Sequence, residues 1–193
     1  TTPKFAYPME WDNFAAIQIS TFDHWWTKQI GFKARNKAKQ AEKKGVELRE
    51  EPFSDALVQG IWEVYNESPV RQGRKFKHYG KDLATVYAEE ATFLDRSIFV
   101  GAYLEGKMIG FIKLVIDESG TQAGLMNIVS MIGHRDKAPT NALVARAVKI
   151  ASWSCWIDSI WASCGSCWPP PPSAKKKIPS ALSKAVGSVG QPS

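Results

Sequence analysis

The stretch from Ser97 to Val115 decides the fold, and it reads Ser-Ile-Phe-Val-Gly-Ala-Tyr-Leu-Glu-Gly-Lys-Met-Ile-Gly-Phe-Ile-Lys-Leu-Val. Its two halves are rich in branched and aromatic residues, and the Glu105-Gly106 pair between them is a tight-turn signal. The stretch therefore predicts an antiparallel hairpin of strands 97–104 and 107–116. A further turn at Gly120 precedes a third strand, 124–132, which completes a three-stranded meander.

Two helices are predicted before this meander. The first is capped by Ser54 or Asp55 and ended by Pro69, and Asp82 caps the second. We expect the first helix to line one face with Leu57, Val58, Ile61, Trp62, Val64 and Tyr65 at helical spacing, and the second helix to carry Leu83, Val86, Tyr87 and Leu94. A last helix, capped by Thr140 or Asn141, follows the meander and faces inward through residues 143–151.

The chain before these helices is strongly basic. Residues 28–49 hold eight Lys and Arg residues and two Glu residues, a local net charge of 8 − 2 = +6 that equals the imbalance of the whole chain. Good helix formers predict a basic helix from about 26 to 44 that ends at Gly45, followed by a short strand at 46–49. A second basic cluster without acids spans 71–81. Such clusters attract polyanions, although a solvated helix face explains them equally well.

Composition places the chain among globular proteins of one domain. An apolar content of 44% in 193 residues can fill a core without disulfides or metals. No run approaches the roughly 20 uncharged apolar residues needed to span a bilayer, and we expect no leader, because the first residues do not show a basic-then-apolar pattern with a small-residue cleavage site. We therefore expect a cytoplasmic protein without a membrane span, with an irregular segment 1–25, a domain 26–152 and a tail 153–193.

The tail differs from the rest of the chain. Three cysteines and four tryptophans fall within residues 153–168, four prolines follow, and the segment from Pro169 is too poor in apolar residues to order itself. The tail is either a native linker or the product of a truncation or frameshift. The Cys164-Gly-Ser-Cys167 spacing could serve zinc or redox chemistry, but only Cys155 is nearby as a further ligand, so we predict no metal site.

The element order, strand, two helices, three antiparallel strands and helix, resembles the GNAT acyltransferase fold. The Ser97–Val115 stretch is similar to its second and third strands, where a pattern gay-x-x-gk-x-iGf recurs. The run Lys39-Gln-Ala-Glu-Lys-Lys-Gly-Val46 resembles the segment before the domain in Fem-type aminoacyltransferases. The resemblance implies an α/β (α+β) fold with a mixed, mainly antiparallel sheet and flanking helices. Its C-terminal part is incomplete, because only 157–162 could supply a fifth strand.

The resemblance also implies an N-acyltransferase that moves an acetyl or aminoacyl group to a small-molecule or peptide amine. The donor would be acetyl-coenzyme A or another acyl donor, aminoacyl-tRNA among them, with its pantetheine arm along strand 124–132. The donor's phosphates would meet the start of the last helix, because the first N–H groups of a helix lack partners. The glycines of the usual pyrophosphate loop are missing between Gly133 and Asn141.

Candidate site residues follow from these placements. For the donor phosphates we expect Arg135, Lys137, Thr140, Asn141 and Ala142, with His134 as a possible base. For the acceptor we expect Arg71, Arg74 and His78 in the basic loop, with Tyr79 as proton donor to the thiolate, and Asn127 and Ser130 on the third strand, because buried polar groups need a partner or ligand.

Two other functions remain open at this point. The basic helix 28–44 could bind RNA or an anionic surface as part of a non-catalytic module. The chain could also be an inactive, truncated remnant of the acyltransferase fold. A polar turn around Asp136 and a solvated basic loop are the structural explanations that compete with the proposed donor and acceptor residues.

Overall fold

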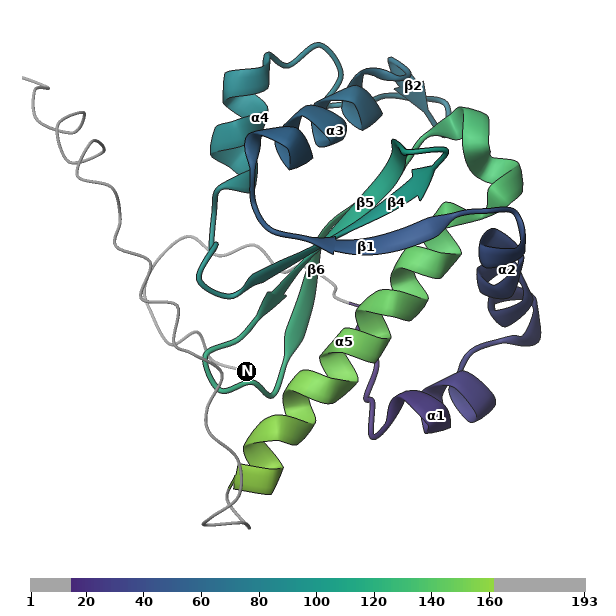
Figure 1. Cartoon of the computed structure of the whole chain (residues 1–193), viewed down its shortest axis with the longest axis vertical. Helices are drawn as coiled ribbons and strands as arrows, with labels where there is room; N and C mark the ends of the chain where they lie inside the picture. The colour runs from purple at the N-terminus through teal and green to yellow at the C-terminus, as the bar shows by residue number, and fades with distance from the viewer. Residues whose placement is uncertain (1–14, 162–193) are drawn as a thin grey trace, which may run out of the picture.

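The computed structural model describes residues 15–161, with side chains up to Ser152, and places one antiparallel sheet between two layers of helices (Figure 1). The sheet order is β1-β4-β5-β6. Its strands are β1 (Glu47–Glu51), β4 (Ser97–Leu104), β5 (Lys107–Ile116) and β6 (Ala123–Ser130). This confirms the predicted α/β class and the hairpin, whose turn residues Glu105 and Gly106 both have positive φ, as a tight two-residue turn requires.

Helices α3 (Asp55–Asn66) and α4 (Leu83–Glu90) pack on one face of the sheet, and α5 (Pro139–Trp161) packs on the other (Figure 1). Because both faces are covered, β4 and β5 are buried along most of their length and read as almost continuous apolar runs. Ser54 accepts a hydrogen bond from the Leu57 amide and Asp82 from the Thr85 amide, so both predicted N-caps are confirmed.

The α4 face differs from the prediction. Leu83, Tyr87 and Leu94 are more than 40% exposed, whereas Val86 and Glu90 are fully buried. Residues four apart share one face of a helix, and in this eight-residue helix that face holds Val86 and Glu90. The prediction that this helix carries Leu94 was wrong, because α4 ends at Glu90, and Leu83 and Tyr87 lie on its exposed side.

The predicted basic helix 26–44 is two helices. A short α1 (Phe22–His24) runs into a π-helical turn, η1 (Trp25–Gln29), the backbone is extended at Ile30 and Gly31, and α2 (Phe32–Lys43) then begins. Ile and Gly are weaker helix formers than the Lys, Ala and Gln residues around them, which explains the break. Gly45, with φ of 80°, ends α2 as predicted, and α2 packs on α5.

The third strand and the last helix also differ from expectation. Strand β6 ends at Ser130, not at residue 132, and the sheet of the described residues ends there, so β6 is an edge strand whose first half is exposed instead of buried. Its exposed residues include Leu125 and Met126. A 3-10 helix, η2 (Ile132–Lys137), precedes α5, which starts at Pro139 and runs to Trp161. Residues 157–161 are therefore helical and cannot form a fifth strand.

The loop between α3 and α4, predicted to be irregular, contains a small hairpin of β2 (Val70–Arg71) and β3 (Arg74–Lys75). Within residues 15–161, no helix has the length and apolarity needed to cross a membrane.

Candidate functional site

A buried polar cluster joins both helices of one face to the edge of the sheet. Its members are Tyr65 of α3, Glu90 of α4, Lys113 of β5 and Asn127 of β6. The Tyr65 hydroxyl and Asn127 Nδ2 each donate to Glu90 Oε1, both over 2.9 Å. Lys113 Nζ donates to the carbonyl oxygens of Glu90 and Thr92 at 2.8 and 2.9 Å. The cluster therefore connects the core to Asn127, which is half-buried at the edge.

One polar atom of this cluster has no hydrogen-bond partner. Glu90 Oε2 is buried and accepts no hydrogen bond, and Lys113 Nζ lies 4.0 Å away. Burial raises the pKa of the Glu90 carboxyl, although the bonds from Tyr65 and Asn127 and the charge of Lys113 act in the opposite direction. Burial likewise lowers the pKa of Lys113 and raises the pKa of Tyr65.

Strand β6 carries a bulge next to this cluster. Asn127 pairs with Lys113 and Leu125 pairs with Leu114, so Met126 is an extra residue on β6. A bulge leaves one residue outside the ladder and bends the strand, and bulges are frequent beside active sites. Met126 is also 54% exposed. The outer edge of β6, which pairs with no further strand among residues 15–161, is therefore irregular beside Asn127.

The loop between β6 and α5 binds a carboxylate from the same chain. The amides of Ile132 and Gly133 donate to the two oxygens of Glu67 over 2.9 and 2.8 Å. Arg71 also reaches Glu67, at 3.4 Å, and donates to the Ser130 carbonyl at 2.6 Å and the Val64 carbonyl at 3.0 Å. Arg71 thus ties the end of α3 to the end of β6, and the loop amides already hold an anion.

The start of α5 offers fewer free donors than the sequence suggested. Pro139 has no N–H group and stands at the first position of the helix, where proline is favoured. The amides of Asn141 and Ala142 both donate to the Ala138 carbonyl. The amides of Asn141 and Ala142 are therefore not free to bind a pyrophosphate, and the prediction that Thr140 or Asn141 caps the helix was wrong, because both residues lie inside α5.

The predicted donor residues do not meet at one point. Lys137 lies 3.4 Å from Asp136, whose carbonyl and carboxylate also bind Lys44. The Thr140 hydroxyl is 2.7 Å from that of Ser130, while Ala142 is buried against α2 and β1. His134 Nδ1 is buried without a hydrogen-bond partner. Arg135 is exposed; the pKa of Arg71 is lowered mainly by burial and also by the charge of Arg135, while Glu67 acts in the opposite direction.

The predicted acceptor residues do not lie at one site. His78 stacks on Tyr65, with ring centroids 4.4 Å apart, and Tyr65 connects it through Glu90 to Asn127. Ser130, by contrast, bonds to Thr140 of α5 and so faces the opposite side of the sheet from Asn127. Arg74 and Tyr79 are exposed. Of the predicted acceptor residues, Asn127 is therefore a member of the buried cluster and His78 contacts it through Tyr65.

Sequence reasoning missed Glu67, Glu90, Tyr65 and Lys113 as site residues. Lys113 did give a signal, because it is a lone charge inside an apolar strand and a buried lysine needs a partner. Nothing in the sequence identifies that partner, since Glu90 lies 23 residues earlier. The described residues contain no group of His, Cys, Asp or Glu that could hold a metal ion; Cys164 and Cys167 lie outside them.

No family model and no curated protein sequence matches the chain. Solved structures similar to it include the PaiA N-acetyltransferase from Thermoplasma acidophilum in complex with coenzyme A, with 21% identity and a TM-score of 0.44 over 56% of this chain and 72% of that one. An aminoglycoside acetyltransferase from an uncultured soil metagenomic sample shares 13% identity, with a TM-score of 0.41 over 56% and 72% of the two chains.

The aminoglycoside 6'-N-acetyltransferase from Acinetobacter haemolyticus shares 17% identity with this chain. Its TM-score is 0.40, over 68% of this chain and 99% of that chain. At identities this low, the similarity extends no further than the fold.

Proposed function

We propose that the chain is an N-acyltransferase of the GNAT type, which transfers an acyl group from a thioester to an amine at the open edge of β6. The element order supports this function: two helices after β1, a three-stranded antiparallel meander, and a helix that leaves the end of β6. The observation that carries the proposal is the bulge at Met126, which lies on this open edge beside Asn127 and the buried Glu90 carboxyl.

An unpaired strand edge suits the arm of such a donor. Its backbone N–H and C=O groups can bond an extended ligand that contains amides, as they would bond another strand. The pantetheine arm of an acyl thioester is a ligand of this kind. The β6 backbone would hold the donor in line, so that rate enhancement comes mainly from proximity and orientation.

Asn127 is the residue we propose to bind the acceptor amine. Because Nδ2 donates to Glu90, the side-chain amide is fixed with Oδ1 as its free acceptor. Oδ1 can then accept from the amine N–H and direct the nitrogen lone pair toward the thioester carbon. Glu90 acts through Asn127 and is a positioning residue.

The reaction then needs little further chemistry from the protein. The amine nitrogen bonds to the carbonyl carbon, the C–S bond breaks, and the amine loses its proton to solvent. Tyr79 remains our candidate for protonating the thiolate, because its hydroxyl is exposed and has no hydrogen-bond partner among residues 15–161.

Donor recognition should depend on the arm and not on the nucleotide part of coenzyme A. The amides that would hold a pyrophosphate are bonded to Glu67 or to Ala138, and Arg135 is the main exposed cation near them. We therefore expect acetylpantetheine to react with an efficiency within about tenfold of that of acetyl-coenzyme A, because few phosphate contacts would be lost.

The test is thiol release by the full chain with acetyl-coenzyme A, acetylpantetheine and, as a third donor, aminoacyl-tRNA. The acceptors would be a polyamine, an aminoglycoside and a peptide with a free N-terminus. Transfer from both thioesters supports the proposal. Absence of transfer from all donors, together with calorimetry that detects no donor binding, would exclude it.

The Asn127→Ala variant tests the acceptor site. We expect KM for the amine to rise by about tenfold, the loss of one good hydrogen bond, while KM for the thioester changes little. Gln59→Ala, which removes an exposed amide on α3, is the matched control. Equal effects of Asn127→Ala on both KM values would indicate a merely structural role.

A further inference from the structure

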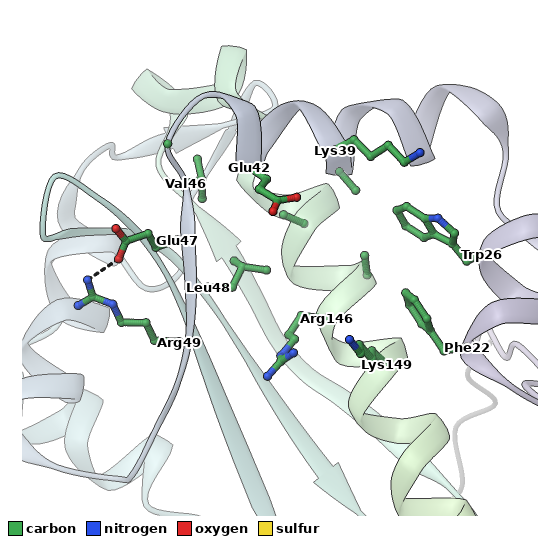
Figure 2. Close-up of a pocket in the computed structure, with 14 residues that line it drawn as sticks. Phe22, Trp26, Lys39, Glu42, Val46, Glu47, Leu48, Arg49, Arg146 and Lys149 are labelled. Atoms are coloured by element: carbon green, nitrogen blue, oxygen red, sulfur yellow. Dashed lines mark hydrogen bonds and ion pairs between the residues drawn. The ribbon is translucent and has the colours of Figure 1, made fainter.

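A groove of about 810 Å³ lies on the face of the sheet opposite the Glu90 cluster, between α2, α5 and β1 (Figure 2). Helix α2 approaches α5 through Ala38 and Ala41, and the groove is bounded on α5 by Ala142 and Ala145. These small side chains leave space between the elements. The volume is in the range of pockets that hold small ligands.

One wall of the groove is aromatic. Phe22 and Trp26 are both half-buried and stack on each other, with ring centroids 5.6 Å apart and ring planes inclined by 22° (Figure 2). They come from α1 and η1, which the break at Gly31 turns back toward α5. Stacked, partly exposed rings present a flat apolar face to the groove.

The charged residues in the rest of the lining are mostly cationic. Lys39, Arg49, Arg146 and Lys149 face two acids, Glu42 and Glu47, a local net charge of 4 − 2 = +2. Arg49 pairs with Glu47, and Arg146 pairs with Glu50. Lys39 and Lys149 have no acidic partner among the described residues, and Lys149 Nζ lies 5.8 Å from the Phe22 ring centroid. Uncompensated positive charge therefore stands beside the aromatic wall.

We infer that this groove binds a nucleobase that carries a phosphate, either as a free nucleotide or as the end of a single-stranded nucleic acid. A base would stack on the Phe22–Trp26 wall, which any base can do because every base has a π face. Its phosphate would bind Lys149, whose ammonium group has no acidic partner among the described residues, while Lys39, at the other end of the aromatic pair, adds positive charge to the groove (Figure 2). This site does not depend on the acyltransferase proposal, because it uses none of the residues at β6.

The aromatic wall distinguishes this site from a surface that attracts polyanions by charge alone. Lys33, Lys37 and Lys43 are exposed on α2 outside the groove and could attract any polyanion. The RNA contact predicted for helix 28–44 would use such residues equally. A site for a base and its phosphate should instead depend on Trp26 and on the groove lysines.

The inference can be tested by calorimetry, which measures the affinity of the full chain for four ligands. These are adenosine monophosphate, uridine monophosphate, adenosine and a single-stranded oligoadenylate of five nucleotides. We expect the monophosphates to bind at least about tenfold more tightly than adenosine, because the phosphate adds a charged contact. Trp26→Ala and Lys149→Gln should each weaken binding by about tenfold, the scale of one lost stacking or charge contact. Lys37→Gln, a matched cation outside the groove, should change binding less than about twofold.

The oligoadenylate identifies the source of the nucleotide. Equal affinity for monophosphate and oligoadenylate indicates a free nucleotide, and a tighter oligoadenylate that still depends on Trp26 indicates a strand end. Absence of binding by all phosphate-bearing probes would overturn the inference, as would binding that Lys37→Gln weakens as much as Lys149→Gln. If Trp26→Ala fails to fold, Lys149→Gln decides the question, because it changes a partly solvated side chain.

Discussion

Glu90 and Lys113 are charged side chains that the fold buries almost completely, with exposures of 0% and 2%. Two carbonyl oxygens and the Thr92 hydroxyl satisfy the Lys113 ammonium group, and Tyr65 and Asn127 satisfy one Glu90 oxygen. Each charge is tolerated because the other is present. In the sequence, Lys113 is unusual as a charged residue in an apolar strand. The identity of its partner depends on how α4 is rotated about its axis, and the local sequence pattern does not predict that rotation.

Removing one member of this pair should be costly. We expect Lys113→Met to lower the free energy of unfolding by about 3–5 kcal/mol, because it leaves the Glu90 carboxylate buried without a counter-charge. Adding Glu90→Gln should restore much of that loss, since the amide carries no charge. Urea denaturation at pH 7 measures both. If Lys113→Met alone were as stable as the unmodified chain, Glu90 and Lys113 would not be electrostatically coupled.

His78 should make stability depend on pH. Burial lowers its pKa below the ordinary value of 6.5, nearby Lys81 and Lys77 act in the same direction, and Glu89 opposes them. As pH falls through 6.5, the unfolded chain takes up a proton before the folded chain does, so folding stability decreases. We expect urea midpoints measured between pH 7.5 and 5.5 to fall more for the unmodified chain than for His78→Phe, which keeps a ring against Tyr65. Parallel curves would contradict this.

At the scale of elements, the sequence predicted what depends on local pattern. The hairpin, its turn, the caps at Ser54 and Asp82 and the end of α2 at Gly45 are all confirmed, because turn and capping residues act within a few positions. The burial of β6 was predicted wrongly. The strand was expected to be buried, but it lies at the edge of the sheet of the described residues, and whether a strand lies at an edge depends on what pairs with it, which is a property of the whole sheet.

Gly110 allows β6 to approach β5. A Cβ atom there would lie 2.9 Å from Ser130 Cβ and 3.0 Å from the Val129 carbonyl oxygen. We expect Gly110→Ala to destabilise the fold by about 1–3 kcal/mol, because the strand backbone itself must shift. Gly124→Ala lies in the same strand pair, with its nearest contact at 3.9 Å, and should be tolerated. Chemical denaturation of both variants is the measurement, and equal stabilities would refute the steric explanation.

At the scale of the whole molecule, the sheet separates two surfaces of different chemistry (Figure 1). On one face, α3 and α4 support Glu90 and Asn127, and on the other, α2 and α5 enclose the groove. Both surfaces are formed by contacts between segments that are distant in the sequence. Glu67, for example, lies 65 positions before Ile132, whose amide it binds. The basic residues were visible in the sequence, but their division between the groove and the outer surface depends on how α2 packs on α5, which is a contact between distant segments.

The two surfaces should bind their ligands independently. A saturating concentration of adenosine monophosphate should change KM for acetylpantetheine by less than about twofold, because the ligands share no residue and the sheet between them is rigid. Lys149→Gln should weaken nucleotide binding and leave KM for acetylpantetheine unchanged, whereas Asn127→Ala should raise KM for the amine and leave nucleotide affinity unchanged. Steady-state kinetics with and without nucleotide measure the coupling. Competition between nucleotide and thioester would instead mean that one ligand reaches both faces around the end of β6, and the separation by the sheet would not hold.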